Sequence, residues 1–160
     1  MKHMLQSLKQ WLLWVFRTLL RGLIAALPFI AGWLIGAFVT TGLAVMIQTQ
    51  NVLARLGAIG AQISLADRLS MTFYDLIHLG SLFVIFILAG TLIAYLVGLL
   101  VFRLAGFGRS FIMIVAGAVM MIVMLLAMKQ AFFGVHLIAG ARNAPELMMQ
   151  MVAGAVGGFV

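Results

Sequence analysis

Long apolar runs separated by short polar stretches dominate this chain. Residues 22–48, 79–102 and 111–128 contain no charged side chain. At about 1.5 Å per residue, each run can cross a hydrocarbon core of roughly 30 Å as a helix. A fourth apolar run, 146–160, falls short of a full crossing, so we expect a short span or a native helix that continues past the stated chain. The pattern predicts an all-α membrane protein, a helical bundle of about four transmembrane segments.

The polar stretches between these runs predict two further elements. In residues 1–21, Leu5, Leu8 and Leu12 share one helical face, and tryptophan and basic residues surround them. This is typical of an amphipathic helix lying in the membrane interface, although a helical extension of the first span remains open. Residues 49–78 are the most polar part of the chain. We expect an outer loop there, with an amphipathic helix that lies on the membrane or is partly re-entrant.

Composition supports a chain that needs a lipid environment. Hydrophobic residues make up 66% and charged residues 8% of the sequence, far from the values of soluble domains. We therefore predict a single membrane-embedded domain over residues 1–160. The absence of cysteine excludes disulfides and thiolate metal sites.

The net charge of +7 is placed at the ends of the apolar runs, where it suits anionic lipid headgroups. No basic face is large enough for a row of phosphates, so we predict membrane lipids and no nucleic acid as partners. The basic residues also predict an integral protein of the bacterial inner membrane with a cytoplasmic N-terminus. The side predicted to be cytoplasmic carries Lys2, Lys9, Arg17, Arg21, Arg103 and Arg109.

Small residues recur every four positions on several runs, a spacing that lets helices approach closely. These predicted packing positions are Gly32, Gly36, Gly90, Ala94, Gly98, Gly154 and Gly158. The partner helix is either internal or in another subunit, and we expect a homo-oligomer.

Polar residues at the outer ends of the spans form a candidate cluster of Arg68, Asp75, His78, His136, Arg142 and Glu146. Asp75 and His78 are neighbours on one helical face, and such a pair can relay protons, bind a metal or orient a nucleophile. The simpler interpretation is an interfacial polar turn. At the opposite side, Arg103 and Arg109 bracket two glycines and can bind a lipid headgroup, unless the loop is an ordinary basic turn.

Met120, Met124 and Met128 repeat on one face of the third run, and thioethers are soft ligands suited to Cu(I). Together with the Gly154-x-x-x-Gly158 pair, this resembles the pattern of the copper-transporter family of trimeric three-span proteins. The chain departs from that pattern in its longer first loop, its extra span and the lack of a methionine-rich outer tail, so we do not assign it to the family. Methionine is also a common filler of helix interfaces.

No catalytic motif is present, and we predict no cofactor. The sequence favours a non-catalytic membrane protein, an oligomeric channel, transport or scaffold component. The alternative is a membrane enzyme or lipid-binding protein that acts at the outer interface through Asp75, His78, His136, Arg142 and Glu146.

Overall fold

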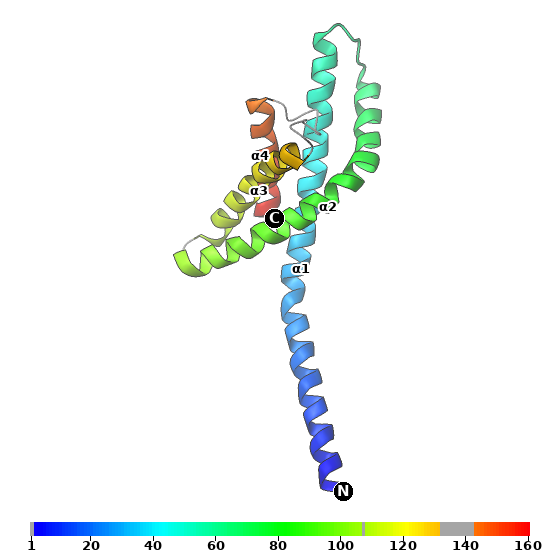
Figure 1. Ribbon diagram of the computed structural model, residues 1–160. Helices are drawn as coiled ribbons and strands as arrows, with labels where there is room; N and C mark the ends of the chain where they lie inside the picture. The colour runs from blue at the N-terminus through cyan, green and yellow to red at the C-terminus, as the bar shows by residue number, and fades with distance from the viewer. Residues whose placement is uncertain (1, 107, 132–142) are drawn as a thin grey trace. The chain divides into compact units, whose positions relative to one another are not determined.

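The computed structural model describes residues 2–106, 108–131 and 143–160. These residues form α1 (Lys2–Ala58), α2 (Leu65–Ala105), α3 (Arg109–Ala131) and α4 (Ala144–Phe159) (Figure 1). Among the described residues, three segments are long and apolar enough to cross a membrane: Phe16–Ala58, Phe83–Ala105 and Arg109–Gln130. The predicted fold class, an all-α protein with membrane-spanning helices, is confirmed.

The helix α1 differs from the predicted division into a surface helix at 1–21 and a span at 22–48. Its backbone is helical from Lys2 to Ala58, with Pro28 inside it. The chain divides into two units within this helix, Met1–Gly32 and Trp33–Val160. In the first unit, Trp14 and Leu23 are among the exposed apolar side chains. The interfacial position of residues 1–21 stays a prediction.

The region predicted as an outer loop with an amphipathic helix, 49–78, is mostly helical. The helix α1 continues to Ala58, and α2 begins at Leu65. Ser64 and Asp67 form a capping box, in which the Asp67 N–H donates to Ser64 Oγ (3.1 Å) and the Ser64 N–H donates to Asp67 Oδ2 (3.0 Å). Gly60 has a φ of 94°, a conformation that glycine adopts without strain. These local signals reverse the chain over a short connection, and the flanking polar residues extend the two helices.

Within the second unit, α2 runs antiparallel to the part of α1 that belongs to this unit. The Trp33 indole N–H donates to Thr91 Oγ1 (3.0 Å) near the beginning of that part, and Thr49 contacts Asp75 near its end. The helix α2 is visibly curved (Figure 1). Its Gly80-Ser81 pair is of the kind at which helices bend, and the Ser81 hydroxyl donates to the carbonyl oxygen of His78 (2.8 Å).

The helices α2 and α3 pack by fitting methionines against glycines. A Cβ added to Gly90 would lie 2.9 Å from Sδ of Met120, and one added to Gly98 would lie 3.1 Å from Sδ of Met113. The order of these contacts shows that the two helices are antiparallel. Ala94, between the two glycines, packs against the buried core.

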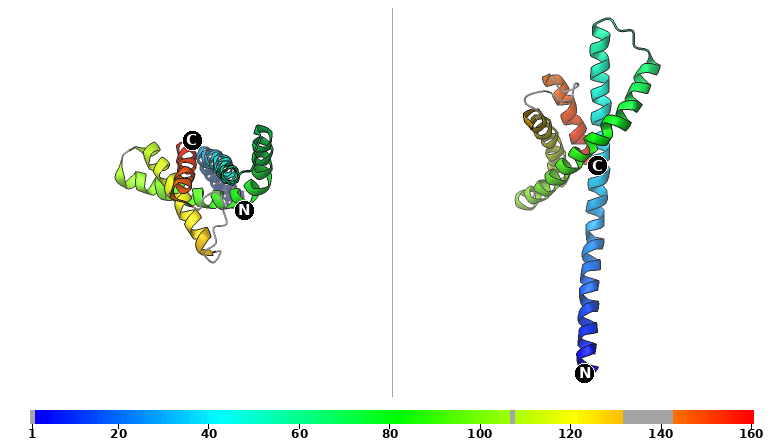
Figure 2. Two further views of the ribbon diagram at one scale, coloured as in Figure 1. Left: turned by 90° about the horizontal axis from the view of Figure 1, so that it is seen from above. Right: turned by 45° about the vertical axis from the view of Figure 1, so that its right-hand side comes forward.

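The helices α3 and α4 lie side by side and antiparallel (Figures 1 and 2). Their backbones touch where Gly117 meets Gly154 and where Gly158 meets the carbonyl of Met113. On its other side, α4 approaches α1, where a Cβ on Gly36 would collide with the Gly157 carbonyl at 2.6 Å. The helix α4 therefore lies between α1 and α3, and glycine at these positions is what allows the approach.

The helix α4 has 16 residues, about 24 Å at the helical rise and short of the bilayer core. It starts after Asn143, whose N–H donates to Glu146 Oε2 (3.3 Å). This short helix corresponds to the fourth span that the sequence predicts as short. Its Ala153 is fully buried in the core with Ala44 and Ile87.

Candidate functional site

Polar side chains are buried along the contact of α1 with α2 and α4, within otherwise apolar helices. We call this set the polar seam. Its members are Thr40, Thr41, Gln48, Thr49, Thr91 and Gln150. Polar groups inside a membrane protein are costly unless they are paired, so their partners decide what the seam can do.

In the polar seam, the hydroxyls of Thr40, Thr41 and Thr91 are satisfied by carbonyl oxygens of their own helices. The Thr40 hydroxyl donates to the Gly36 carbonyl (2.8 Å), and the Thr91 hydroxyl donates to the Ile87 carbonyl (2.7 Å). The Thr41 hydroxyl likewise donates to the carbonyl of Ala37, one turn earlier in α1. Each oxygen keeps acceptor capacity, so the threonines offer weak acceptors but leave no donor unpaired.

The glutamines are only partly satisfied. The Gln150 side-chain amide donates to the Ala44 carbonyl at 3.1 Å and ties α4 to α1. Gln150 is 0% exposed and Gln48 is 6% exposed, and Oε1 of each is buried without a hydrogen-bond donor in the described part of the chain. Gln48 lies one helical turn after Ala44 on α1, and Ala44 is the residue to which Gln150 bonds. The two unpaired amide oxygens therefore lie within about one turn of each other along α1.

At one end of the polar seam, Arg55 on α1 forms an ion pair with Glu146 on α4. The Arg55 Nε–H donates to Oε1 (3.0 Å) and Nη2 donates to Oε2 (2.6 Å), a bidentate geometry. The Glu146 side chain is 13% exposed and that of Arg55 is 37% exposed. Glu146 therefore joins the first turn of α4 to α1.

Asp75 and Arg68 pair with α1 at the hairpin of α1 and α2. The Thr49 hydroxyl donates to Asp75 Oδ2 at 2.7 Å. Arg68 Nη1 donates to Gln50 Oε1 (3.0 Å), and the Gln50 amide in turn donates to Thr72 Oγ1 (3.2 Å). These bonds hold the polar residues of the predicted loop against each other.

His78 does not pair with Asp75. Its Nδ1 lies 3.0 Å from the Tyr74 carbonyl oxygen, and its ring stacks on that of Tyr74 with centroids 4.0 Å apart. Glu146 is likewise engaged by Arg55. Of the predicted outer cluster, His136 and Arg142 lie outside the described residues, and the others are held by separate partners.

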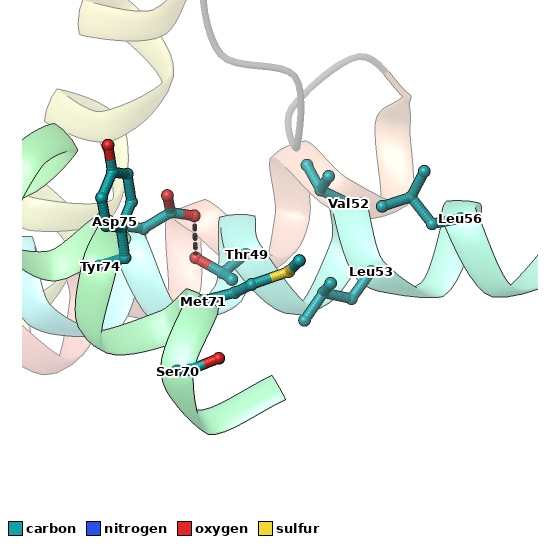
Figure 3. A pocket seen from close by; sticks show the side chains of 8 residues that line it. All are labelled: Thr49, Val52, Leu53, Leu56, Ser70, Met71, Tyr74 and Asp75. Atoms are coloured by element: carbon teal, nitrogen blue, oxygen red, sulfur yellow. Dashed lines mark hydrogen bonds between the residues drawn. The ribbon is translucent and has the colours of Figure 1, made fainter. Parts of the chain in front are cut away.

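A pocket of about 490 Å³ opens beside Asp75 (Figure 3). In Figure 3, the Asp75 and Thr49 pair lies at one end, and the aliphatic side chains of Val52, Leu53 and Leu56 line the other. The remaining lining residues are Ser70, Met71 and Tyr74. Its volume is within the usual range for small-molecule sites.

Arg103 and Arg109 are both exposed beside the connection of α2 and α3. Gly106 and Gly108 there have positive φ values of 71° and 46°, which turns the chain between the two arginines. The two cations thus face the surroundings at one end of the bundle, and headgroup binding by them stays a prediction.

The methionine stripe of α3 contributes to packing. Met120 and Met128 are buried in the core, and Met124 packs against it. In the described ranges no three His, Asp or Glu side chains gather as a metal site would require.

Of the predicted packing positions, Gly32 makes no close helix contact in this structure. A Cβ built on it has nothing within 4 Å.

Sequence reasoning missed three of the residues that organise the site, Arg55, Gln150 and Thr49. Arg55 is in none of the predicted sets of residues, and its pairing with Glu146 depends on the packing of α4 on α1. The sequence signal that could have indicated this ion pair is the position of Arg55 and Glu146, a base and an acid that each stand at the end of an apolar helix face.

The long apolar helices of the described chain define the class as an α-helical membrane protein. Comparisons of the chain with protein-family models, curated proteins and solved structures gave no match.

Proposed function

We propose that the protein is a transport component of the membrane that works as a homo-oligomer, and that its polar seam is the path that a small cation or hydrogen-bond-donating solute follows. The observation that carries this proposal is the pair of buried amide oxygens of Gln48 and Gln150, for which no described residue supplies a hydrogen-bond donor. An unpaired buried acceptor costs about 1–3 kcal/mol. Carbonyl-type oxygens are also the ligands with which membrane channels replace the hydration shell of a cation.

The number of helices supports an oligomer. Three described segments are long enough to cross a membrane, which is few to enclose a path. Large apolar side chains such as Ile93, Val119 and Val123 are exposed on α2 and α3. They suit contact with lipid or with a second copy. We propose the orientation that basic residues favour, with the N-terminus and the connection of α2 and α3 in the cytoplasm.

A flux assay tests the proposal. The purified protein is placed in liposomes, and entry of K⁺, Na⁺, H⁺ and a small polyol is followed with trapped reporters. Replacing both Gln48 and Gln150 by leucine keeps the volume and removes both acceptors, so the flux of the transported solute is expected to fall at least about tenfold, near the cost of losing such a contact. Met149→Leu is the matched control, because Met149 is on the same helix and 49% exposed.

The oligomeric state of each variant is measured in detergent, so that loss of flux can be separated from loss of assembly. Flux equal to that of protein-free vesicles for every solute would overturn the transport proposal and leave a scaffold. If the double leucine variant transports the solute at the same rate as the parent, the path does not run through the polar seam.

We do not propose a catalytic role at the outer face. Asp75 and His78 bond to different partners, and the Glu146 carboxylate is neutralised by Arg55. General acid–base work by these groups would require those bonds to break first.

A further inference from the structure

The pocket beside Asp75 has a polar end and an apolar end, and it is formed by the facing surfaces of α1 and α2 (Figure 3). Its polar end is a carboxylate, with Asp75 Oδ2 accepting one hydrogen bond from Thr49 at 2.7 Å. A carboxylate has room for several hydrogen bonds on its two oxygens. Asp75 therefore keeps acceptor capacity for a donor that enters the pocket.

No cation of the described chain neutralises Asp75. The ion pair recorded in the described ranges joins Arg55 to Glu146, and Arg68 is directed to Gln50 by a 3.0 Å hydrogen bond. Within the described residues, the charge of Asp75 is thus left without a counter-ion, and a cationic group that enters the pocket can supply one. A carboxylate at the end of an apolar pocket binds a cation more strongly than it would in open water.

The rest of the lining suits an apolar body. Leu53, Leu56 and Met71 supply aliphatic surface, and Met71 adapts to ligands of different shape. Tyr74 adds an aromatic ring, and rings attract ammonium groups through their electron-rich faces. The volume of about 490 Å³ exceeds that of a bare ion and suits an organic molecule.

We propose that this pocket binds an ammonium group attached to an apolar body, with Asp75 bonding the ammonium and Leu53, Leu56 and Met71 covering the apolar part. The ammonium comes from a free amphipathic amine or from the headgroup of an amine-bearing lipid. The proposal concerns binding and does not depend on transport through the polar seam.

The test uses the full chain in maltoside micelles, which contain no amine. Hexylammonium, hexanol and hexanoate are titrated as probes of equal length and different charge, and binding is followed by saturation-transfer NMR. Hexylammonium is expected to bind at least about tenfold more tightly than hexanol, since a charge-assisted hydrogen bond is worth roughly 1.5–3 kcal/mol. Hexanoate is expected to bind least.

Asp75→Asn should reduce hexylammonium binding to the level of hexanol, while its amide oxygen can still accept the Thr49 bond and preserve the fold. Asp67→Asn is the matched control, because Asp67 is on the same helix, is exposed and does not line the pocket. Met71→Gln, at an exposed position, should weaken hexylammonium and hexanol alike. Equal binding of hexylammonium and hexanol, or hexylammonium binding that survives Asp75→Asn, would overturn the proposal.

Two short-chain lipids distinguish the sources of the ammonium. Displacement of hexylammonium by dihexanoyl phosphatidylethanolamine, but not by dihexanoyl phosphatidylglycerol, assigns the pocket to a lipid headgroup. Displacement by neither assigns it to a free amine. Displacement by both lipids equally would show that the pocket recognises acyl chains and would contradict the role of Asp75.

Discussion

Replacing Gly154 by alanine is expected to force α3 and α4 apart. A Cβ on Gly154 would overlap the carbonyl oxygen of Gly117 and Cγ of Met121, and a Cβ on Gly117 would overlap the carbonyl of Gly154. A flexible side chain can rotate away from a new methyl group, but a helix backbone cannot. The two helices must therefore separate, and the surrounding core loses contacts.

The magnitude follows from a comparison with Gly42, where a Cβ would meet nothing within 4 Å. Alanine gains up to about 1 kcal/mol over glycine in a helix, and this gain applies equally to Gly42→Ala and Gly154→Ala. The difference in free energy of unfolding between the two variants thus measures the clash alone. Overpacking a well-packed core costs about 1–3 kcal/mol, and we expect the upper half of that range because the overlap involves backbone atoms.

The assay is reversible unfolding of the detergent-solubilised protein by sodium dodecyl sulfate, followed by far-ultraviolet circular dichroism. Gly154→Ala should unfold at a lower mole fraction of the denaturing detergent than the parent, and Gly42→Ala at the same or a higher one. If the two alanine variants unfold within about 0.5 kcal/mol of each other, less than the cost expected of overpacking, the close contact of α3 with α4 is refuted.

Three further predictions concern individual polar contacts. Glu146→Gln should lower the free energy of unfolding by about 1–3 kcal/mol, because it leaves the half-buried Arg55 without its carboxylate. Replacing both Arg55 and Glu146 by methionine should restore most of that loss. A double methionine variant that is as unstable as Glu146→Gln would contradict this. Tyr95→Phe removes a 2.6 Å hydrogen bond to an α4 carbonyl and should cost about 1 kcal/mol in the same titration, so an unchanged midpoint would argue against that bond. Hydrogen bonds from the hydroxyl and the N–H of Ser64 lower the pKa of Asp67 below its ordinary 3.8, so ionised Asp67 stabilises the start of α2 above about pH 4, and this contribution is lost as the pH falls through the lowered pKa. Hydrogen exchange of the first-turn amides should show fraying of the parent that increases in acid, whereas Asp67→Asn, which has no carboxylate to titrate, should fray to the same extent at both pH values. The same dependence on pH in variant and parent would rule this out.

Much of the local structure could be predicted from the sequence. The uncharged apolar runs predicted the membrane-spanning helices, and the shorter run at 146–160 predicted the short helix α4. For residues 49–78 the sequence predicted an outer loop with an amphipathic helix, and it did not show how the helices divide there. Capping at Ser64 and a tight turn at Gly60 instead let two long helices meet.

The partners of the site residues could not be predicted in this way. Asp75 and His78 are neighbours along the helix, yet Asp75 bonds to Thr49 on α1 and His78 bonds to its own helix. Whether a neighbouring pair interacts depends on which helix packs over it. The spacing of the residues carries no information about that.

Taken alone, the sequence determined that this is a helical membrane protein, where most of its helices lie and where small residues permit close packing, because periodicity, charge and capping act within a few residues. The tertiary structure alone decided that Gly154 meets Gly117, that Gln150 ties α4 to α1 and that Arg55 pairs with Glu146. These contacts join residues far apart in the chain. Each depends on the rotation of a helix about its axis and on its offset along its neighbour, and only the packing of all the helices together sets those two quantities.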